Sequence, residues 1–240
     1  MALTNSPLKA PLYTILYEDN HLLVVNKVPG VLVQGDATGD EPLAELCKDY
    51  IKQKHNKPGA VFLGVVHRLD RPVSGVVVFA RTSKALERMN ELFRERETKK
   101  IYWAIVNQAP PNAEGTLTHW LLKDEQKNKT TAFTRETRGA LRSELHYRIL
   151  SRNDSRWLLE VNPITGRPHQ IRVQLATMGC AIIGDLKYGY PEANHDASIC
   201  LHARSLEFIH PVQKQSVMFV APPPENRLWK NFSAVYDKLD

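Results

Sequence analysis

The chain has 240 residues, of which 42% are hydrophobic and 24% charged, so it can form a large core and is too apolar to be mostly disordered. Its formal net charge of +6 favours a polyanionic partner such as RNA or DNA. The longest apolar run, near "GVVVFA", is far shorter than the ~20 residues of a membrane span, and the N-terminus lacks the pattern of a secretory signal. Three widely spaced cysteines without a Cys-x-x-Cys pair argue against a zinc knuckle or a disulfide framework. We therefore expect a cytoplasmic protein without a membrane segment or a bound metal.

The N-terminal part of the chain alternates strand and helix signals. It predicts two short strands within 13–33 joined by a polar "EDN" turn, and a helix within 41–55. The segment 58–81 has apolar runs on both sides of "HRLDRPVSG", which predicts a strand, a loop and a strand. A second helix is predicted within 82–100, because its apolar residues form one stripe and Thr82 or Ser83 can cap it.

The rest of the chain is richer in strands. The run "IYWAIV", 101–106, is apolar on both faces and predicts a central strand, and the alternating segments from 115 to 161 predict an antiparallel meander. The segment 168–179 predicts a helix with Pro168 at its first position and Gly179 just past its end. Two strands, 200–210 and 216–223, and a helix within 225–239 follow. Consecutive strands of this kind predict an α+β fold with a mainly antiparallel sheet.

One carboxylate in the motif "HRLDRPVSG" invites a functional interpretation. Asp70 lies between Arg68 and Arg71, and neighbouring guanidinium groups favour the charged form of a carboxylate. An ionised aspartate suits a nucleophile or an electrostatic stabiliser, but also a simple ion pair on a loop. The apolar flanks and the stiff "PVSG" turn place it at a loop end held against the core, where functional residues are common.

A second motif, "TGRPHQIRVQLA", places Arg172 in an otherwise apolar helix, one turn after His169. A buried arginine needs an acceptor, because an unpaired buried charge is strongly unfavourable. A backbone carbonyl or Glu160 would satisfy it. The alternative is that Arg172 pairs with Asp70 and keeps that carboxylate oriented and ionised.

Three blocks of the sequence together resemble the RluA-type family of RNA pseudouridine synthases. They are "HRLDRPVSGVVVFARTSKALERMNELFRERETKKIYWAIV", "ITGRPHQIRVQLATMGCAIIGDLKYG" and "LHARSLEFIHP", in family order from about Tyr13 to about Pro222. The resemblance implies that a uridine in structured RNA is detached from its ribose and re-attached through C5, without a cofactor or a metal. It also implies one α+β domain over 1–240, with its core at about 12–222, in which helices flank a bent mixed sheet and a central basic cleft.

The resemblance assigns roles to individual residues. Asp70 corresponds to the catalytic aspartate, Arg172 to the arginine that salt-bridges it, and Tyr102 to the tyrosine that stacks on the target base, although core packing explains Tyr102 equally well. Arg68 corresponds to the arginine that enters the RNA stack when the base flips out. The full set of residues expected to contact RNA is Arg68, His67, Leu201, His169, Lys99 and Lys100.

Many relatives carry an N-terminal S4 RNA-binding module, and only about a dozen residues precede the first predicted strand here. We therefore expect no S4 module, so that the catalytic domain itself would bind RNA, as a monomer, at a stem-loop of ribosomal or transfer RNA. Further basic residues are available for this, or form a solvated face: Lys123, Lys127, Lys129, Arg135, Arg138 and Arg142.

Two other classes of function are open at this point. A non-catalytic RNA-binding or ribosome-assembly factor on the same fold would be expected to lack Asp70, Arg172 or both. A glycoside hydrolase would need two carboxylates that flank the scissile bond. The sequence places no second acidic residue near either motif, which argues against a glycosidase.

Overall fold

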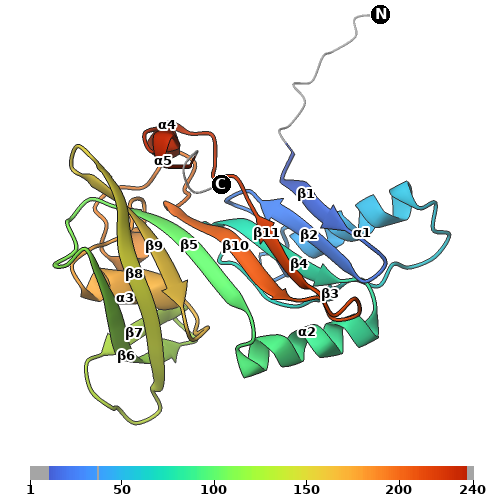
Figure 1. Cartoon of the computed structure of the whole chain (residues 1–240), viewed down its shortest axis with the longest axis horizontal. Helices are drawn as coiled ribbons and strands as arrows, with labels where there is room; N and C mark the ends of the chain where they lie inside the picture. Colours follow the sequence, from blue (N-terminus) through green and yellow to red (C-terminus); the bar gives the residue numbers. More distant parts are fainter. Residues whose placement is uncertain (1–10, 37, 237–240) are drawn as a thin grey trace, which may run out of the picture.

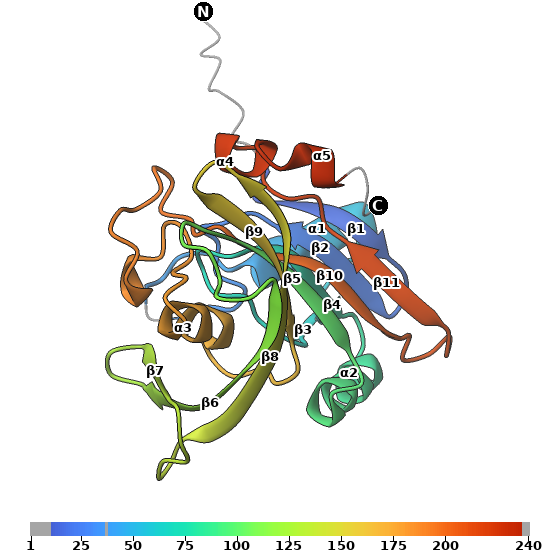
Figure 2. The ribbon, with the colours of Figure 1, turned by 60° about the vertical axis from the view of Figure 1, so that its left-hand side comes forward.

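A computed structural model describes residues 11–36 and 38–236, and a single sheet of eleven strands runs through them (Figures 1 and 2). The strands are β1 (Tyr13–Glu18), β2 (Leu22–Lys27), β3 (Gly64–Val65), β4 (Ser74–Ala80), β5 (Lys99–Val106), β6 (Glu114–Asp124), β7 (Lys129–Phe133), β8 (Leu141–Asn153), β9 (Arg156–Pro163), β10 (Leu201–Ile209) and β11 (Ser216–Val220). The helices are α1 (Leu43–Lys54), α2 (Ser83–Glu95), α3 (Gln170–Thr177), α4 (Arg227–Lys230) and α5 (Ser233–Tyr236), with a 3-10 turn η1 (Leu186–Tyr188).

The sheet order is β1-β2-β4-β10-β5-β9-β8-β6-β7, with β11 added to β10 and β3 to β4. Among the described strands, β4 and β10 are the one parallel pair, and every other pairing is antiparallel. Figure 1 shows that β6, β7, β8 and β9 run at a steep angle to β2, β10 and β11, so the sheet is bent. The predicted mixed, mainly antiparallel α+β architecture is confirmed.

Strand β4 is buried along its whole length because helices cover both of its faces. Val77 and Phe79 belong to the cluster that contains the buried residues of α1, whereas Val76 and Val78 pack with Met89 of α2. Alternate residues of a strand point to opposite faces, which explains why "VVVFA" is apolar throughout. The cap of α2 is Thr82, whose hydroxyl accepts from the Ala85 amide at 3.2 Å.

The predicted central strand is confirmed. The predicted antiparallel meander is corrected, because the strands are antiparallel but β8 pairs with β6 instead of with the preceding strand β7. Strand β5 lies between β10 and β9, and its second half, from Trp103 to Val106, is buried. Strands β6, β7, β8 and β9 pair antiparallel in the other half of the molecule, where α3 packs against β6, β7 and β9. Among the described residues, no helix is long and apolar enough to span a bilayer.

Two predicted elements differ at their boundaries. The strand before "HRLDRPVSG" shrinks to two residues, Gly64 and Val65, which pair with Ala80 and Phe79. Further along the same edge, the Val78 amide donates to His67 Nε2 instead of to a strand, and β10 pairs with the start of β4. Helix α3 begins at Gln170 rather than Pro168, since His169 has a left-handed backbone with φ of 54°. The Gln170 side chain accepts from the Thr165 hydroxyl and the Arg167 amide, and so holds the loop that precedes the helix.

The C-terminal segment packs as two short helices instead of the single helix predicted, and residues 237–239 of that prediction lie outside the described part. Trp229 and Phe232 are each only 2% exposed, and the Tyr236 ring stacks on Trp103 at 4.7 Å between centroids. The predicted core limit near Pro222 is therefore too early. The core extends to these aromatic rings.

Candidate active site

Asp70 lies on the loop between β3 and β4, where the Val73 amide donates to the Asp70 carbonyl at 3.0 Å. Its carboxylate is 32% exposed, and its Oδ2 atom accepts a hydrogen bond from Arg172 Nη1 at 2.8 Å. The predicted pairing of Arg172 with Asp70 is confirmed. The arrangement keeps a carboxylate oriented at the surface while one of its oxygens, Oδ1, receives no hydrogen bond from the described residues.

Arg172 is buried in α3 and has a second acidic partner. Its Nε donates to Asp185 Oδ2 at 2.7 Å and its Nη2 to Asp185 Oδ1 at 2.8 Å, while the Tyr188 ring lies 5.1 Å from its guanidinium carbon. Burial alone would lower the Arg172 pKa, but the hydrogen bonds and charges of Asp185 and Asp70 raise it above its ordinary value. Arg172 is therefore permanently charged.

Asp185 was not among the residues predicted for the site. We found no second acidic residue near either motif, and the structure corrects this by placing Asp185, thirteen positions after Arg172, against its guanidinium. The other acceptor considered for Arg172, Glu160, instead binds Arg148 at 2.7 Å. The available signal was the aspartate in "GDLKYG", a charged residue separated from the apolar "AII" segment by a single glycine. Asp185 is 1% exposed, so it cannot flank a scissile bond as the second carboxylate of a glycosidase would.

A buried lysine holds the Asp70 loop. Lys27, at the end of β2, is fully buried and donates to the carbonyls of Val28, Val31 and Arg71 at 3.0, 2.8 and 3.2 Å. Burial lowers the Lys27 pKa to about 7, which the charge of Asp70 opposes and that of Arg71 reinforces. The sequence did contain a signal for Lys27, because this lysine ends the apolar strand "LLVVNK".

His169 and Tyr188 approach Asp70 from the side of Arg172. The Tyr188 hydroxyl accepts from the Thr130 amide at 2.9 Å and lies 2.7 Å from His169 Nδ1. Both contacts are satisfied if the hydroxyl donates to Nδ1, which places the proton of the neutral ring on Nε2, and Nε2 lies 3.7 Å from Asp70 Oδ2. Burial lowers the His169 pKa and Asp70 partly opposes this, so the ring is neutral at pH 7.

Tyr102 and Leu201 lie on neighbouring central strands near Asp70. Tyr102 of β5 is opposite Ala203 of β10, and Leu201 is opposite Ala104, so both side chains project from the same face of the sheet. Burial and the charge of Asp70 raise the Tyr102 pKa, so its hydroxyl stays protonated. Tyr102 also packs against the main core, which means that the core-packing interpretation and the site assignment are compatible. Leu201 is 4% exposed.

The remaining residues expected to contact RNA differ in accessibility. Arg68 and Lys99 are exposed, whereas Lys100 is half-buried. Burial lowers the pKa of Lys100, and the nearby charge of Arg96 lowers it further. His67 is stacked on Phe93 at 4.9 Å and its Nε2 accepts from the Val78 amide at 3.1 Å. Burial lowers the His67 pKa to about 4, with a contribution from Lys100.

These contacts show that His67 holds the motif against the sheet and α2.

Arg71, for which the sequence suggested no role, donates from Nη2 to Asp40 Oδ2 at 2.5 Å and from Nε to the Gly30 carbonyl at 3.0 Å. The basic central cleft and the RNA contacts themselves stay predictions.

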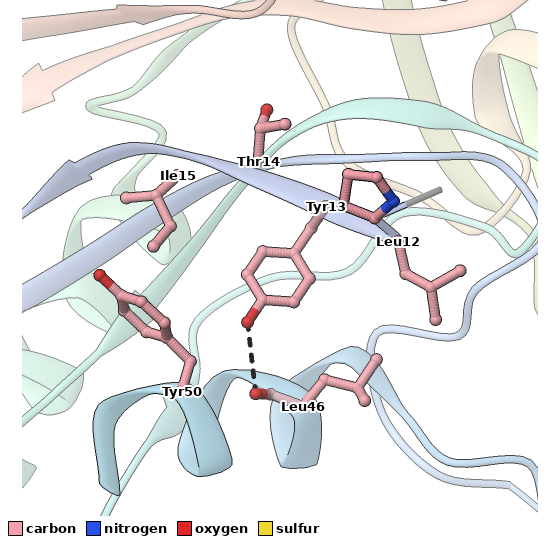
Figure 3. Close-up of a pocket in the computed structure, with 7 residues that line it drawn as sticks. Leu12, Tyr13, Thr14, Ile15, Leu46 and Tyr50 are labelled. Carbon is pink, nitrogen blue, oxygen red and sulfur yellow. Dashed lines mark hydrogen bonds between the residues drawn. The ribbon is translucent and has the colours of Figure 1, made fainter. Parts of the chain in front are cut away.

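A hollow elsewhere on the surface is formed by β1, the two residues before it, and α1 (Figure 3). Tyr13 and Tyr50 line it, and the Tyr13 hydroxyl donates to the Leu46 carbonyl at 3.3 Å. No residue of the predicted site lines this hollow. Within residues 11–36 and 38–236, no group of three or more His, Cys, Asp or Glu side chains is placed to hold a metal ion.

Comparison with known proteins identifies the family. Residues 21–177 match the family model described as RNA pseudouridylate synthase. The dual-specificity RNA pseudouridine synthase RluA of Escherichia coli is 36% identical over 224 residues, which cover 90% of this chain and 96% of that protein. The ribosomal large subunit pseudouridine synthase C of Buchnera aphidicola is 32% identical over 87% of this chain, which spans only 66% of that relative's length.

A solved structure, that of human RNA pseudouridylate synthase domain containing 4, is similar with a TM-score of 0.75 at 27% identity. The match covers 93% of this chain and 92% of the human chain. The fold is therefore that of a pseudouridine synthase, as the sequence predicted. The chain belongs to the RluA-type family of RNA pseudouridine synthases.

Proposed function

We propose that this protein converts a uridine in structured RNA to pseudouridine, with Asp70 as the catalytic carboxylate. One observation carries the assignment of Asp70. Its carboxylate is 32% exposed while Arg172, itself buried, donates to Oδ2 at 2.8 Å. An ionised carboxylate that is both held and accessible is the group that attack on a ribose requires.

The reaction begins at the ribose. The Asp70 carboxylate either attacks C1′ or removes the proton from C2′, and in both routes the bond between N1 and C1′ breaks. The base turns and C5 forms the new bond to C1′, which breaks the bond between Asp70 and C1′ in the first route and is accompanied by return of the proton to C2′ in the second. C5 then loses its proton to solvent and N1 gains one, so that the product is an isomer of the substrate. Oδ1 accepts no hydrogen bond from the described residues and is the oxygen available for this step, because Oδ2 is bonded to Arg172.

The substrate base must leave its stack to reach Asp70. We assign the stacking surface for the base to Tyr102, with Leu201 on the same face of the sheet, and the filling of the vacated position to the exposed Arg68. Ribosomal or transfer RNA is the proposed substrate class. The formal charge of +6 and the names of the relatives, one a ribosomal large subunit enzyme, support it. A monomeric state and a cytoplasmic location remain predictions.

The test compares wild-type protein with Asp70→Asn on RNA isolated from cells that lack the gene. We expect the wild type to restore at least one pseudouridine and Asp70→Asn to restore none, with RNA affinity and thermal unfolding nearly unchanged. Asp40→Asn is the matched control, because Asp40 is also an aspartate paired with an arginine but lies outside the site. Comparable pseudouridine formation by Asp70→Asn refutes the role of Asp70. If deletion of the gene removes no pseudouridine, the non-catalytic RNA-binding function is favoured instead.

A further inference from the structure

The buried carboxylate of Asp185 has no part in the proposed reaction, yet it makes the most extensive contact with Arg172. Two of the three nitrogen groups of that guanidinium, Nε and Nη2, donate to Asp185, at 2.7 and 2.8 Å, and only Nη1 reaches Asp70. A two-point contact of this kind fixes the plane of a guanidinium as well as its position. The direction of the Nη1 bond to Asp70 is therefore set by Asp185.

Asp185 is itself held rigidly. Its carbonyl accepts from the amides of Tyr188 and Tyr190, both at 3.1 Å, and its own amide donates to Ile182 at 3.0 Å. With 1% of its side chain exposed, Asp185 cannot touch RNA. Its direct contact with the site is through Arg172, and its charge also acts on His169.

The charges of the three groups also matter. Arg172 contributes one positive charge and Asp185 one negative charge, so the pair that faces Asp70 is neutral overall. A lone guanidinium would stabilise the Asp70 carboxylate more strongly and so make it a poorer nucleophile or base. The other titratable groups near Asp70 are Lys27, His169 and Tyr102, and of these His169 is also influenced by the charge of Asp185, which favours its protonated form.

We propose that Asp185 is a positioning residue for the isomerisation, which aligns Arg172 and balances its charge so that Asp70 is held but remains reactive. The proposal rests on the function proposed above. It predicts that loss of the Asp185 charge slows the chemical step and leaves RNA binding intact, because no surface that RNA touches has changed.

The test uses Asp185→Asn, which keeps the size of the side chain. We expect kcat to fall about 10- to 100-fold, the range found when a residue that orients an active-site ligand is replaced, while KM for the RNA changes less than about 3-fold. Asp196→Asn is the matched control. Like Asp185, Asp196 lies between α3 and β10, but it is exposed, and it accepts from the Ser198 amide at 3.1 Å. It should leave kcat and KM unchanged.

A double substitution shows whether the effect passes through Arg172. In an Arg172→Lys background the two-point contact is absent, so adding Asp185→Asn should lower kcat no further. Should Asp185→Asn fail to fold, Asp185→Glu retains the charge, and we expect it to fold with reduced kcat and wild-type KM. Loss of folding in both variants gives Asp185 a purely structural role and overturns the proposal, as does a wild-type kcat in a folded variant. Failure of the proposed function looks different, because the wild type itself would then form no pseudouridine.

Discussion

Gly75, the last residue of "HRLDRPVSG", allows β4 and β10 to approach each other, and Gly75→Ala tests this. Its φ of +119° is one that L side chains rarely adopt. A Cβ at this position would lie 2.3 Å from the Ala203 carbonyl oxygen and 2.6 Å from the Ala203 nitrogen. Both atoms belong to the backbone of the parallel partner strand, where Ala203 is in register with Gly75. The strands must therefore separate to accommodate the methyl group.

The cost of Gly75→Ala has two parts. A positive φ in a residue with a side chain costs about 1–2 kcal/mol, and overpacking of a filled interior costs about 1–3 kcal/mol more. Gly179→Ala is the matched control, because its φ is +88° and a Cβ there meets nothing within 4 Å. It incurs the backbone strain alone. We expect Gly75→Ala to lose about 1–3 kcal/mol more free energy of unfolding than Gly179→Ala.

The assay is urea unfolding of both variants followed by circular dichroism, together with pseudouridine formation at a temperature where both are folded. Separation of the strands moves Ser74, four residues after Asp70, so Gly75→Ala should also lose activity while Gly179→Ala keeps it. Equal loss of stability in the two variants would refute the argument that the close contact with Ala203 requires glycine.

Two further predictions concern stability. Burial opposes ionisation of Glu18, but hydrogen bonds from Lys54, His55 and Tyr50 and the charge of Arg81 lower its pKa to about 2 from 4.5. Because this carboxyl pKa is lowered on folding, its ionisation stabilises the folded state above pH 4.5, and that stability is lost as the pH falls from 4.5 towards 2. Urea unfolding should therefore show that Glu18→Gln loses about 2–3 kcal/mol between pH 7 and pH 4.5 and progressively less below pH 4.5. A difference that does not change with pH would contradict this. Arg71→Ala should change the free energy of unfolding by less than about 1 kcal/mol in the same assay, because the side chains of its ion pair, Arg71 and Asp40, are 44% and 54% exposed. A larger loss would mean that the hydrogen bond from Arg71 to the Gly30 carbonyl dominates.

Local sequence patterns predicted most elements correctly. Apolar spacing located α1 and α2, the continuous apolar run located β5 at the centre of the sheet, and Thr82 was one of two predicted caps. These features depend on residues a few positions apart, which a single segment contains. A partner for Arg172 was predictable because a charge in an apolar helix requires one, and the family resemblance favoured Asp70, 102 positions away, over the other acceptors considered.

Other features depended on segments that meet only in the folded chain. The strand before Asp70 has a strand-like composition, but only two of its residues pair with β4, because the Val78 amide on that edge donates to the His67 side chain instead. The last helix is divided between Lys230 and Ser233, and the burial of Trp229 and Phe232 in the core is seen only in the folded chain.

The motifs of the sequence by themselves determined the family and the two charged residues at the centre of the candidate site, because these residues lie within short, characteristic blocks. Only the tertiary structure decided what surrounds them. Lys27 and Asp185 look ordinary in sequence, and become part of the site because the fold buries both and brings them to the Asp70 loop and to Arg172. A buried charge must be paired or hydrogen-bonded, but which partner it finds depends on how distant strands and loops pack.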